Sequence, residues 1–354
     1  MKKSLIGTGL VLALALAGCA TPPPAQTAAP TAAPQSDFLA CMVSDAGGFD
    51  DKSFNETSYA GLERAVSELG VQKKEVQSAK AADFAKNVQS MVDAKCEVIV
   101  TVGFALGDAT AAAAKANPDV KFAIVDFAYD KPEANVRGLV FNTGDPSFMA
   151  GYLAASLSKS GTVGTYGGAK IPTVTAFMNG YAQGVAYYNT AKGKDVKVLG
   201  WDTAKKDGSF IPGTNPFGDV AGGKQVATNL VAQGADVLLP VAGPSGEGAL
   251  QVAQASGGKV SAMWVDTDGC ISFEKYCPVI ASSVGKAMDV AVFDAIKAAK
   301  DGTFSNEPFV GTLANDGVYL APFHEFDGKV STETRAELDK IKADLVAGTI
   351  KVAP

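Results

Sequence analysis

The sequence predicts an α/β fold of two lobes, each built on a doubly wound parallel sheet. Strand and helix patterns alternate from about residue 37 onward, and repeated β-then-α units form parallel sheets with helices on both faces. A Gly-Asp-Pro break after Asn142 separates two series of such units. The roughly 318 residues from position 37 to the end suffice for two lobes of ordinary size.

The first series begins with the apolar run "DFLACMV", which has the pattern of a short buried strand. Apolar residues recur at helical spacing over residues 54–69, and a polar helix is expected over 81–94. A strand, a helix and two more strands follow in "CEVIVTVG", "GDATAAAAKAN", "VKFAIVDF" and "VRGLVFN".

The second series begins with a long helix in "TGDPSFMAGYLAASLSKSG". Further helices are expected near residues 172–190, 222–233 and 246–256. The strands of this series are expected in "GTVGTYGG", "DVKVLGWD", "ADVLLPVAG" and "VSAMWVD".

Two later segments are expected to cross between the lobes. The helix "GKAMDVAVFDAIKAAKDG" should return to the first lobe, and "GVYLAPF" with the helix "STETRAELDKIKADLVAG" to the second. The first lobe then comprises residues 37–142 and about 267–308, and the second 143–266 and about 309–354. Repeated crossing predicts a hinged pair of lobes with a ligand cleft between them.

The N-terminus has the pattern of a bacterial lipoprotein signal peptide over residues 1–18. "MKK" precedes a short apolar run and "LAGC", in which Cys19 would be lipidated and become the mature N-terminus. The run is short for a transmembrane helix. Residues 19–36 hold little besides Ala, Pro, Thr and Gln, and are expected to form a disordered tether. A lipid-anchored protein of the cell envelope, facing the periplasm or the outside, is expected.

Composition and motifs argue against several function classes. The mature chain has 29 basic and 37 acidic residues without a basic cluster, which argues against a nucleic-acid partner. "GDVAGGKQ" has Gln225 where a phosphate-binding loop has Ser or Thr, and "GTVGTYGG" lacks GxGxxG spacing. The lone His324 and the lack of GxSxG remove the commonest hydrolase arrangements. No enzyme and no cofactor are expected.

Four cysteines remain besides Cys19, and an even number in an exported protein suggests disulfides. Cys270 and Cys277 could close a small loop. Cys41 and Cys96 fall near the starts of two strands that are expected to be neighbours. No metal site is expected, because the chain has no CxxC pair and a single histidine.

Paired carboxylates occur at Asp50 with Asp51 and at Asp266 with Asp268. They leave acid–base chemistry open, but adjacent acids before a helix more often cap its N-terminus.

Polar and aromatic residues gather where strands are expected to end, which is where open α/β sheets bind ligands. Carboxylates accept hydrogen bonds from hydroxyl and ring N–H groups, so these acids suit a neutral ligand rich in donors and would repel an anion. Two opposed rings could sandwich a flat ligand. The residues are Asp45, Asp126, Asp266, Gly243, Phe54 and Phe217.

Five segments resemble the basic membrane protein (Bmp) family of substrate-binding lipoproteins: "DAGGFDDKSFNETSYAGL", "VRGLVFNTGDPSFMAGYLAA", "GADVLLPVAGPSGEGAL", "WVDTDG" and "SSVGKAMD". The resemblance runs from about residue 37 to the C-terminus. It implies a type I periplasmic-binding-protein fold with three crossings between the lobes. It also implies a purine nucleoside in the cleft, which the protein would deliver to the permease subunits of an ABC importer.

The resemblance also implies ligand contacts. Asp45 and Asn55 would flank the base and Asp126 would help to hold it. Phe54 and Phe217 would stack on opposite faces of the base. The ribose hydroxyls would meet Gly243, Asp266 and Lys286.

Two alternatives concern this assignment. Phe217 fits the family's Phe-x-Asp spacing with Asp219, whereas Phe210 fits the Gly-Ser-Phe that precedes it. The loop "CISFEKYC" replaces a shorter loop of the family. Other readings of the function are a binding protein for a sugar or furanone, a sensor, and a nucleoside-cleaving enzyme using Asp45 or Asp50.

Overall fold

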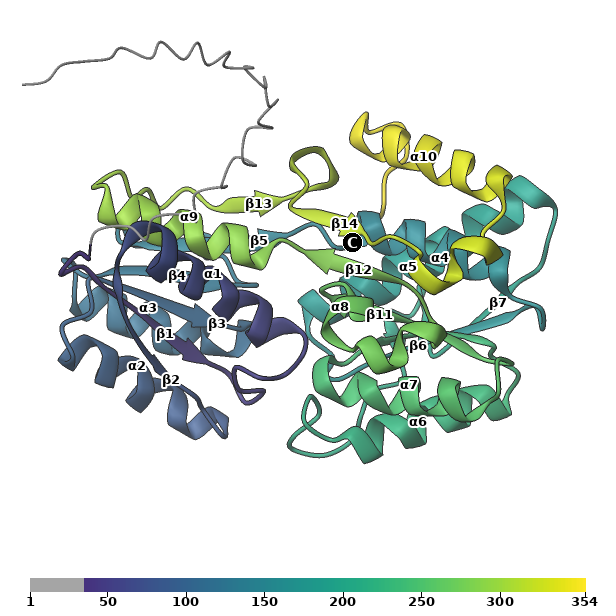
Figure 1. Ribbon diagram of the computed structural model, residues 1–354, viewed down its shortest axis with the longest axis horizontal. Coiled ribbons are helices and arrows are strands. Elements are labelled where there is room, and N and C mark those ends of the chain that lie inside the picture. The colour runs from purple at the N-terminus through teal and green to yellow at the C-terminus, as the bar shows by residue number, and fades with distance from the viewer. Residues whose placement is uncertain (1–34) are drawn as a thin grey trace, which may run out of the picture. The chain divides into compact units, whose positions relative to one another are not determined.

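Two six-stranded sheets form the framework of residues 35–354, the part of the chain that the computed structural model describes (Figure 1). The expected signal peptide, Cys19 and most of the expected tether lie outside the described residues. Ser36 donates its backbone N–H to the carbonyl of Gly70 at 2.8 Å, so folded structure extends at least to Ser36.

All strands of the first sheet are parallel, in the order β13-β5-β4-β3-β1-β2. The bounds are β1 Leu39–Ser44, β2 Gln72–Val76, β3 Val98–Val102, β4 Lys121–Val125, β5 Val136–Phe141 and β13 Phe309–Gly311. The central strands bury both faces, because α1 (Phe54–Leu69) and α9 (Met288–Lys300) pack on one side and α2 (Phe84–Asp93) and α3 (Gly107–Ala116) on the other (Figure 1).

The second sheet has the order β14-β12-β11-β10-β6-β7, with only β14 antiparallel to its neighbour. The bounds are β6 Thr162–Gly167, β7 Lys197–Leu199, β10 Val237–Val241, β11 Ser261–Asp266, β12 Ile280–Lys286 and β14 Val318–Leu320. Residues of α4 (Gly144–Leu157), α5 (Pro172–Lys192) and α10 (Thr332–Val346) share one core of this lobe, and residues of α6 (Val220–Ala232) and α7 (Glu247–Ala255) share the other.

Short elements complete the two lobes. A hairpin of β8 (Trp201–Asp202) and β9 (Asp207–Gly208) follows β7. The others are α8 Gly269–Ser272 and the 3-10 turns η1 Ala81–Asp83, η2 Phe104–Leu106, η3 Gly243–Gly246, η4 Glu274–Val279, η5 Leu313–Asn315 and η6 His324–Lys329. Among the described helices, none is long and apolar enough to cross a membrane.

The chain crosses between the sheets three times, at residues 142–143, at Ala287 and at 312–317. The crossings are joined by backbone hydrogen bonds from Asn142 N to Gly311 O at 2.8 Å and from Ala287 N to Gly317 O at 3.0 Å. The hinge therefore has the three segments that the family resemblance implies.

Two lobe boundaries drawn from the sequence need correction. The segment 267–308 was assigned to the first lobe, but its first half contains β12, which pairs with β11 in the second sheet. Only α9 returns to the first lobe, where it packs on α1. Conversely, β13 at Phe309–Gly311 belongs to the first sheet. The boundaries therefore move to about 287 and 312, because β12 is buried throughout and needs a neighbour on each side.

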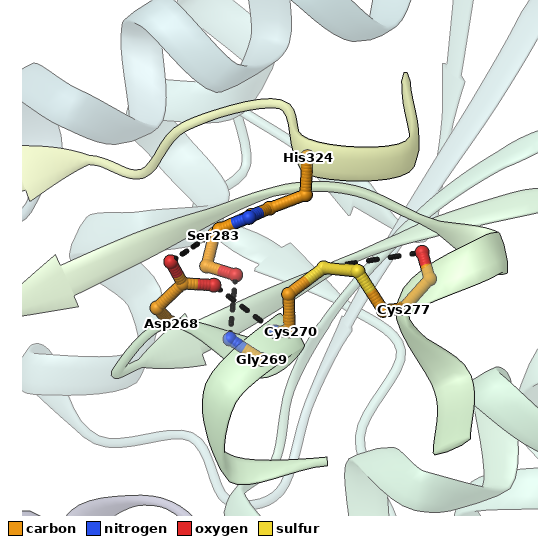
Figure 2. The surroundings of a disulfide bond; sticks show 6 residues. All are labelled: Asp268, Gly269, Cys270, Cys277, Ser283 and His324. Atoms are coloured by element: carbon orange, nitrogen blue, oxygen red, sulfur yellow. Dashed lines mark hydrogen bonds and ion pairs between the residues drawn. A yellow bond between two sulfur atoms is a disulfide. The ribbon is translucent and has the colours of Figure 1, made fainter. Parts of the chain in front are cut away.

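Both expected disulfides are present. Cys41 in β1 is bonded to Cys96, which lies just before β3, and β1 and β3 are adjacent in the sheet. Cys270 is bonded to Cys277 and closes the loop that carries α8 and part of η4 (Figure 2).

Candidate ligand-binding site

A cavity of about 280 Å³ is lined by residues from both lobes. Strand ends and the loops after them supply most of its wall, as expected for parallel sheets. All eight residues for which the sequence suggested ligand contacts lie in this wall: Asp45, Phe54, Asn55, Asp126, Phe217, Gly243, Asp266 and Lys286.

The loop between β1 and α1 is organised by Asp51. Its carboxylate accepts the backbone N–H groups of Ser53, Asn55 and Glu56 at 2.9–3.0 Å, and so caps the first turn of α1. This is the capping role that adjacent acids before a helix suggested. Asp50 is exposed, pairs with Lys52 and is not part of the cavity wall, so it is not placed for chemistry there.

Asn55 links the cap to the cavity. Its Nδ2 donates to Asp51 Oδ2 at 3.0 Å and to Asp45 Oδ1 at 2.9 Å. Both amide protons are thus used, while Asn55 Oδ1 is buried and has no hydrogen-bond partner among the described residues. Because a buried acceptor without a donor is costly, this oxygen is suited to receive an N–H or O–H from a ligand.

Asp45 lies against Gly103, whose φ is +120°. A Cβ at Gly103 would come within 2.6 Å of Asp45 Oδ2, so glycine is needed for the carboxylate to sit there. Burial raises the pKa of Asp45 to about 6, although hydrogen bonds from Asn55 and from the Gly47 N–H oppose this shift. The residue is therefore ionised at pH 7 but close to its titration range.

A cluster of three charges occupies another part of the wall. Lys286 Nζ lies 2.7 Å from Asp126 Oδ2 and 3.0 Å from Asp266 Oδ1, and all three residues are buried. Burial raises the pKa of Asp126, and the Lys286 ammonium offsets this only in part. Two carboxylates share one ammonium, so the cluster carries an excess of negative charge. It is suited to donors and cations rather than to anions.

Aromatic rings line the cavity from both lobes. Phe54 begins α1 in the first lobe, and the Lys286 ammonium lies 4.6 Å from the centre of its ring. Phe217 comes from the loop before α6 in the second lobe. A Cβ at Gly168 would lie 2.4 Å from its ring, so a glycine at that position leaves room for the ring. Phe210 is not in the wall; it packs on Trp201, with 6.5 Å between ring centres. Of the two candidates for the second ring, only Phe217 faces the cavity.

Several residues of the wall were not anticipated as ligand contacts, among them Phe104 and Phe177. Phe104 follows the end of β3 just as Asp45 follows β1, so the strand-end rule could have found it. Phe177 is one of the buried residues of α5, and nothing in the sequence around it distinguishes it from a residue of the hydrophobic core.

A second cluster of side chains lies near the Cys270–Cys277 disulfide (Figure 2). The side chains of Asp268, Cys270 and His324 each place an atom that could bind a metal within 4.8 Å of the others. The positions of these residues along the sequence did not suggest this. His324 Nε2 is 2.6 Å from Asp268 Oδ2. Because the sulfur of Cys270 is in a disulfide, this cluster offers two side-chain ligands and not a metal site of the usual four.

Known proteins resemble this chain over nearly its whole length. It is 30% identical over 375 residues to the ABC transporter nucleoside-binding protein BmpA of Lactococcus lactis, with 99% of each chain covered. It is 31% identical over 350 residues to an uncharacterized lipoprotein of Pyrococcus horikoshii, covering 96% of this chain and 82% of that protein.

A solved ABC transporter solute-binding protein of Aeropyrum pernix matches with a TM-score of 0.79 and 25% identity, over 89% of this chain and 92% of that one. This likeness confirms the type I binding-protein fold. The family model "ABC transporter substrate-binding protein PnrA-like", named Bmp, matches residues 38–352. The chain therefore belongs to the Bmp family of ABC transporter substrate-binding proteins.

Proposed function

We propose that this protein binds a nucleoside with a purine base in the cavity between its lobes and delivers it to an ABC importer. One observation carries the proposal. The same cavity wall holds a phenylalanine ring from each lobe together with Asn55, whose buried Oδ1 has no hydrogen-bond partner in the part of the chain that the structure describes. A flat ring that bears N–H donors has the chemistry to fill both requirements. The relative in Lactococcus lactis, named as nucleoside-binding, supports this ligand class.

The base would lie between Phe54 and Phe217. Stacking on such rings contributes about 0.5–1.5 kcal/mol per contact beyond the burial of apolar area. Asn55 Oδ1 and the Asp45 carboxylate would accept N–H groups from the edge of the base, and Asp126 would help to hold it. The cavity of about 280 Å³ is near the lower end of the usual range for small-molecule sites.

The ribose would lie against the other side of the wall. Asp266 would accept hydrogen bonds from the ribose hydroxyl groups, and the Lys286 ammonium would donate hydrogen bonds to the ribose oxygens. Gly243 has φ +49° and leaves room for the backbone to approach the sugar. The excess negative charge of the cluster disfavours phosphates, so the proposed ligand is a nucleoside rather than a nucleotide.

The proposed place of the protein is at the membrane. The N-terminal pattern ending in Cys19 supports lipid anchoring. The relative in Pyrococcus horikoshii, named as a lipoprotein, supports it too. Family membership supports permease subunits as partners. Closure of the lobes on the nucleoside would then present a distinct shape to those subunits.

Thermal unfolding of the full-length protein tests the ligand class. After removal of co-purified ligand, the protein is heated with saturating guanosine, adenosine, inosine, uridine or ribose. A ligand at about 100 times its dissociation constant stabilises by about 2.7 kcal/mol, which raises the unfolding temperature by several degrees. The proposal would be contradicted if ribose alone raised the unfolding temperature, or if none of the nucleosides raised it.

Variants and product analysis sharpen the test. Phe54→Ala and Asp266→Ala should greatly weaken binding while the fold is kept, and Asp50→Ala, which removes an exposed carboxylate outside the wall, should not. Retained affinity in both site variants would refute the assignment. Chromatography of inosine after long incubation should show intact nucleoside, whereas free base would indicate a cleaving enzyme.

A further inference from the structure

The loop just before α1 makes three hydrogen bonds with the second lobe. Ser53 Oγ lies 2.7 Å from Asp266 Oδ2 and 3.4 Å from the carbonyl oxygen of Val265, and Trp264 Nε1 donates to the carbonyl of Lys52 at 3.3 Å. Ser53 is fully buried. All three partners lie at the end of β11, so neighbouring residues of one loop hold one strand end of the opposite lobe.

Ser53 is free to do this because another residue caps the helix. It occupies the N-cap position of α1, where serine usually accepts a backbone N–H, yet its side chain makes no capping bond. Asp51 takes the N–H groups of the first turn instead. The hydroxyl of Ser53 has a single proton to give, and the Asp266 carboxylate at 2.7 Å is a much nearer acceptor than the Val265 carbonyl at 3.4 Å.

The bond determines how the Asp266 carboxylate is presented. Lys286 lies against Oδ1 at 3.0 Å and Ser53 against Oδ2 at 2.7 Å, so each oxygen has one fixed partner and the plane of the carboxylate is set. Each oxygen can accept a further hydrogen bond. A ligand hydroxyl then meets an acceptor that is already oriented, which avoids part of the ordering cost of binding.

We propose that Ser53 is a positioning residue that couples closure of the lobes to the orientation of Asp266. The two residues are 213 positions apart and belong to different lobes, so the bond breaks when the hinge opens. Ser53 itself is not in the cavity wall and needs no contact with the ligand. The inference rests on the proposed function for the ligand, but the bond between the lobes does not.

Ser53→Ala in the full-length protein tests the proposal, with inosine as the probe. Losing a hydrogen bond to a charged group should weaken binding about tenfold to a hundredfold. The loss should be mainly in the dissociation rate, because the bond is made only in the closed form, whereas inosine enters through the open form that ligand-free protein also populates. Thr57→Val is the matched control, because Thr57 donates within α1 to Ser53 O at 2.6 Å and does not cross to the other lobe.

The outcomes separate a role in closure from a merely structural one. Faster dissociation in Ser53→Ala with an unchanged association rate, and wild-type kinetics in Thr57→Val, would support the proposal. Equal losses in both variants, or affinity within twofold of wild type in Ser53→Ala, would overturn it. If wild-type protein does not bind inosine, the nucleoside assignment fails. Small-angle scattering of the ligand-free proteins then decides on Ser53, whose alanine variant should have the larger radius of gyration; equal radii would overturn the proposal.

Discussion

Lys286 Nζ lies 2.7 Å from Asp126 Oδ2, a contact that joins the end of β12 in the second sheet to the end of β4 in the first. Burial alone would lower the pKa of Lys286, but the carboxylates of Asp126 and Asp266 outweigh this and raise that pKa. The lysine therefore stays charged although it is buried, and its charge compensates a buried carboxylate from each lobe.

Lys286→Met should destabilise the protein, because it leaves two buried carboxylates without their cation. We expect the free energy of unfolding at pH 7 to fall by about 3–5 kcal/mol, measured by urea denaturation. The loss should shrink as the pH falls, because burial raises the pKa of Asp126 and its protonation removes one of the two uncompensated charges. Lys170→Met is the control, since its exposed pair with Asp207 should be worth less than about 1 kcal/mol. Equal effects of the two variants would contradict the role of the cluster.

Nucleoside affinity should fall below pH 6, because protonated Asp45 no longer offers two acceptor oxygens. With a pKa of about 6, roughly a tenth of Asp45 is ionised at pH 5, so binding should weaken about tenfold. Calorimetric titrations from pH 5 to 8 check this. Asp45→Asn should bind weakly at every pH and show a flatter profile, whereas an unchanged slope would assign the titration to another group.

Asp45 should act on stability in the opposite direction when no ligand is bound. Its folded pKa of about 6 exceeds the ordinary value of 3.8, so the folded protein binds more protons than the unfolded chain between about pH 4 and 6. Its contribution to the free energy of unfolding therefore falls as the pH rises through this window. Denaturation at several pH values should show that the free energy of unfolding of wild type, minus that of Asp45→Asn, falls between about pH 4 and 6. A difference that does not change with pH would contradict this prediction.

Phe217→Ala and Phe210→Ala should separate binding from stability. Phe217 lines the cavity, so its removal should cost about 2–4 kcal/mol of binding free energy through lost stacking and burial. Phe210 packs on Trp201 and beside Gly167, and its removal should lower the unfolding temperature with little effect on affinity. Titration and thermal unfolding of both variants decide, and the reverse pattern would make Phe210 the stacking ring.

The two disulfides should differ in their contribution to stability. In the chain-entropy account the bond closing the longer loop stabilises more: about 4 kcal/mol for Cys41–Cys96, with a separation of 55, and about 2.5 kcal/mol for Cys270–Cys277, with a separation of 7. Double alanine variants of each pair, compared by denaturation, should follow that order. A larger loss from the short loop would contradict this account.

Local patterns were enough for most of the framework. The buried run of β1 and the helical spacing of α1 depend on residues two to four positions apart, which the sequence displays directly. The polar strand β2, "QKKEV", was missed because it lies at the edge of the sheet and has little apolar surface to bury. No strands were expected at β12 and β13, so the lobe boundaries placed their residues in the wrong lobes, and the sequence of a short strand does not show which sheet it joins.

The strand-end rule and the family motifs brought eight residues together at one cavity without any coordinates. By itself the sequence determined the periodicities, the loops that end in the cleft and the chemistry offered there. Only the tertiary structure decided that Phe217 rather than Phe210 faces the cavity, that Asp51 rather than Asp50 caps α1, and that Ser53 reaches Asp266 across 213 residues. The physical reason is that such contacts depend on how two separately packed sheets lie against each other, and this arrangement produces no periodic pattern of residues in the sequence.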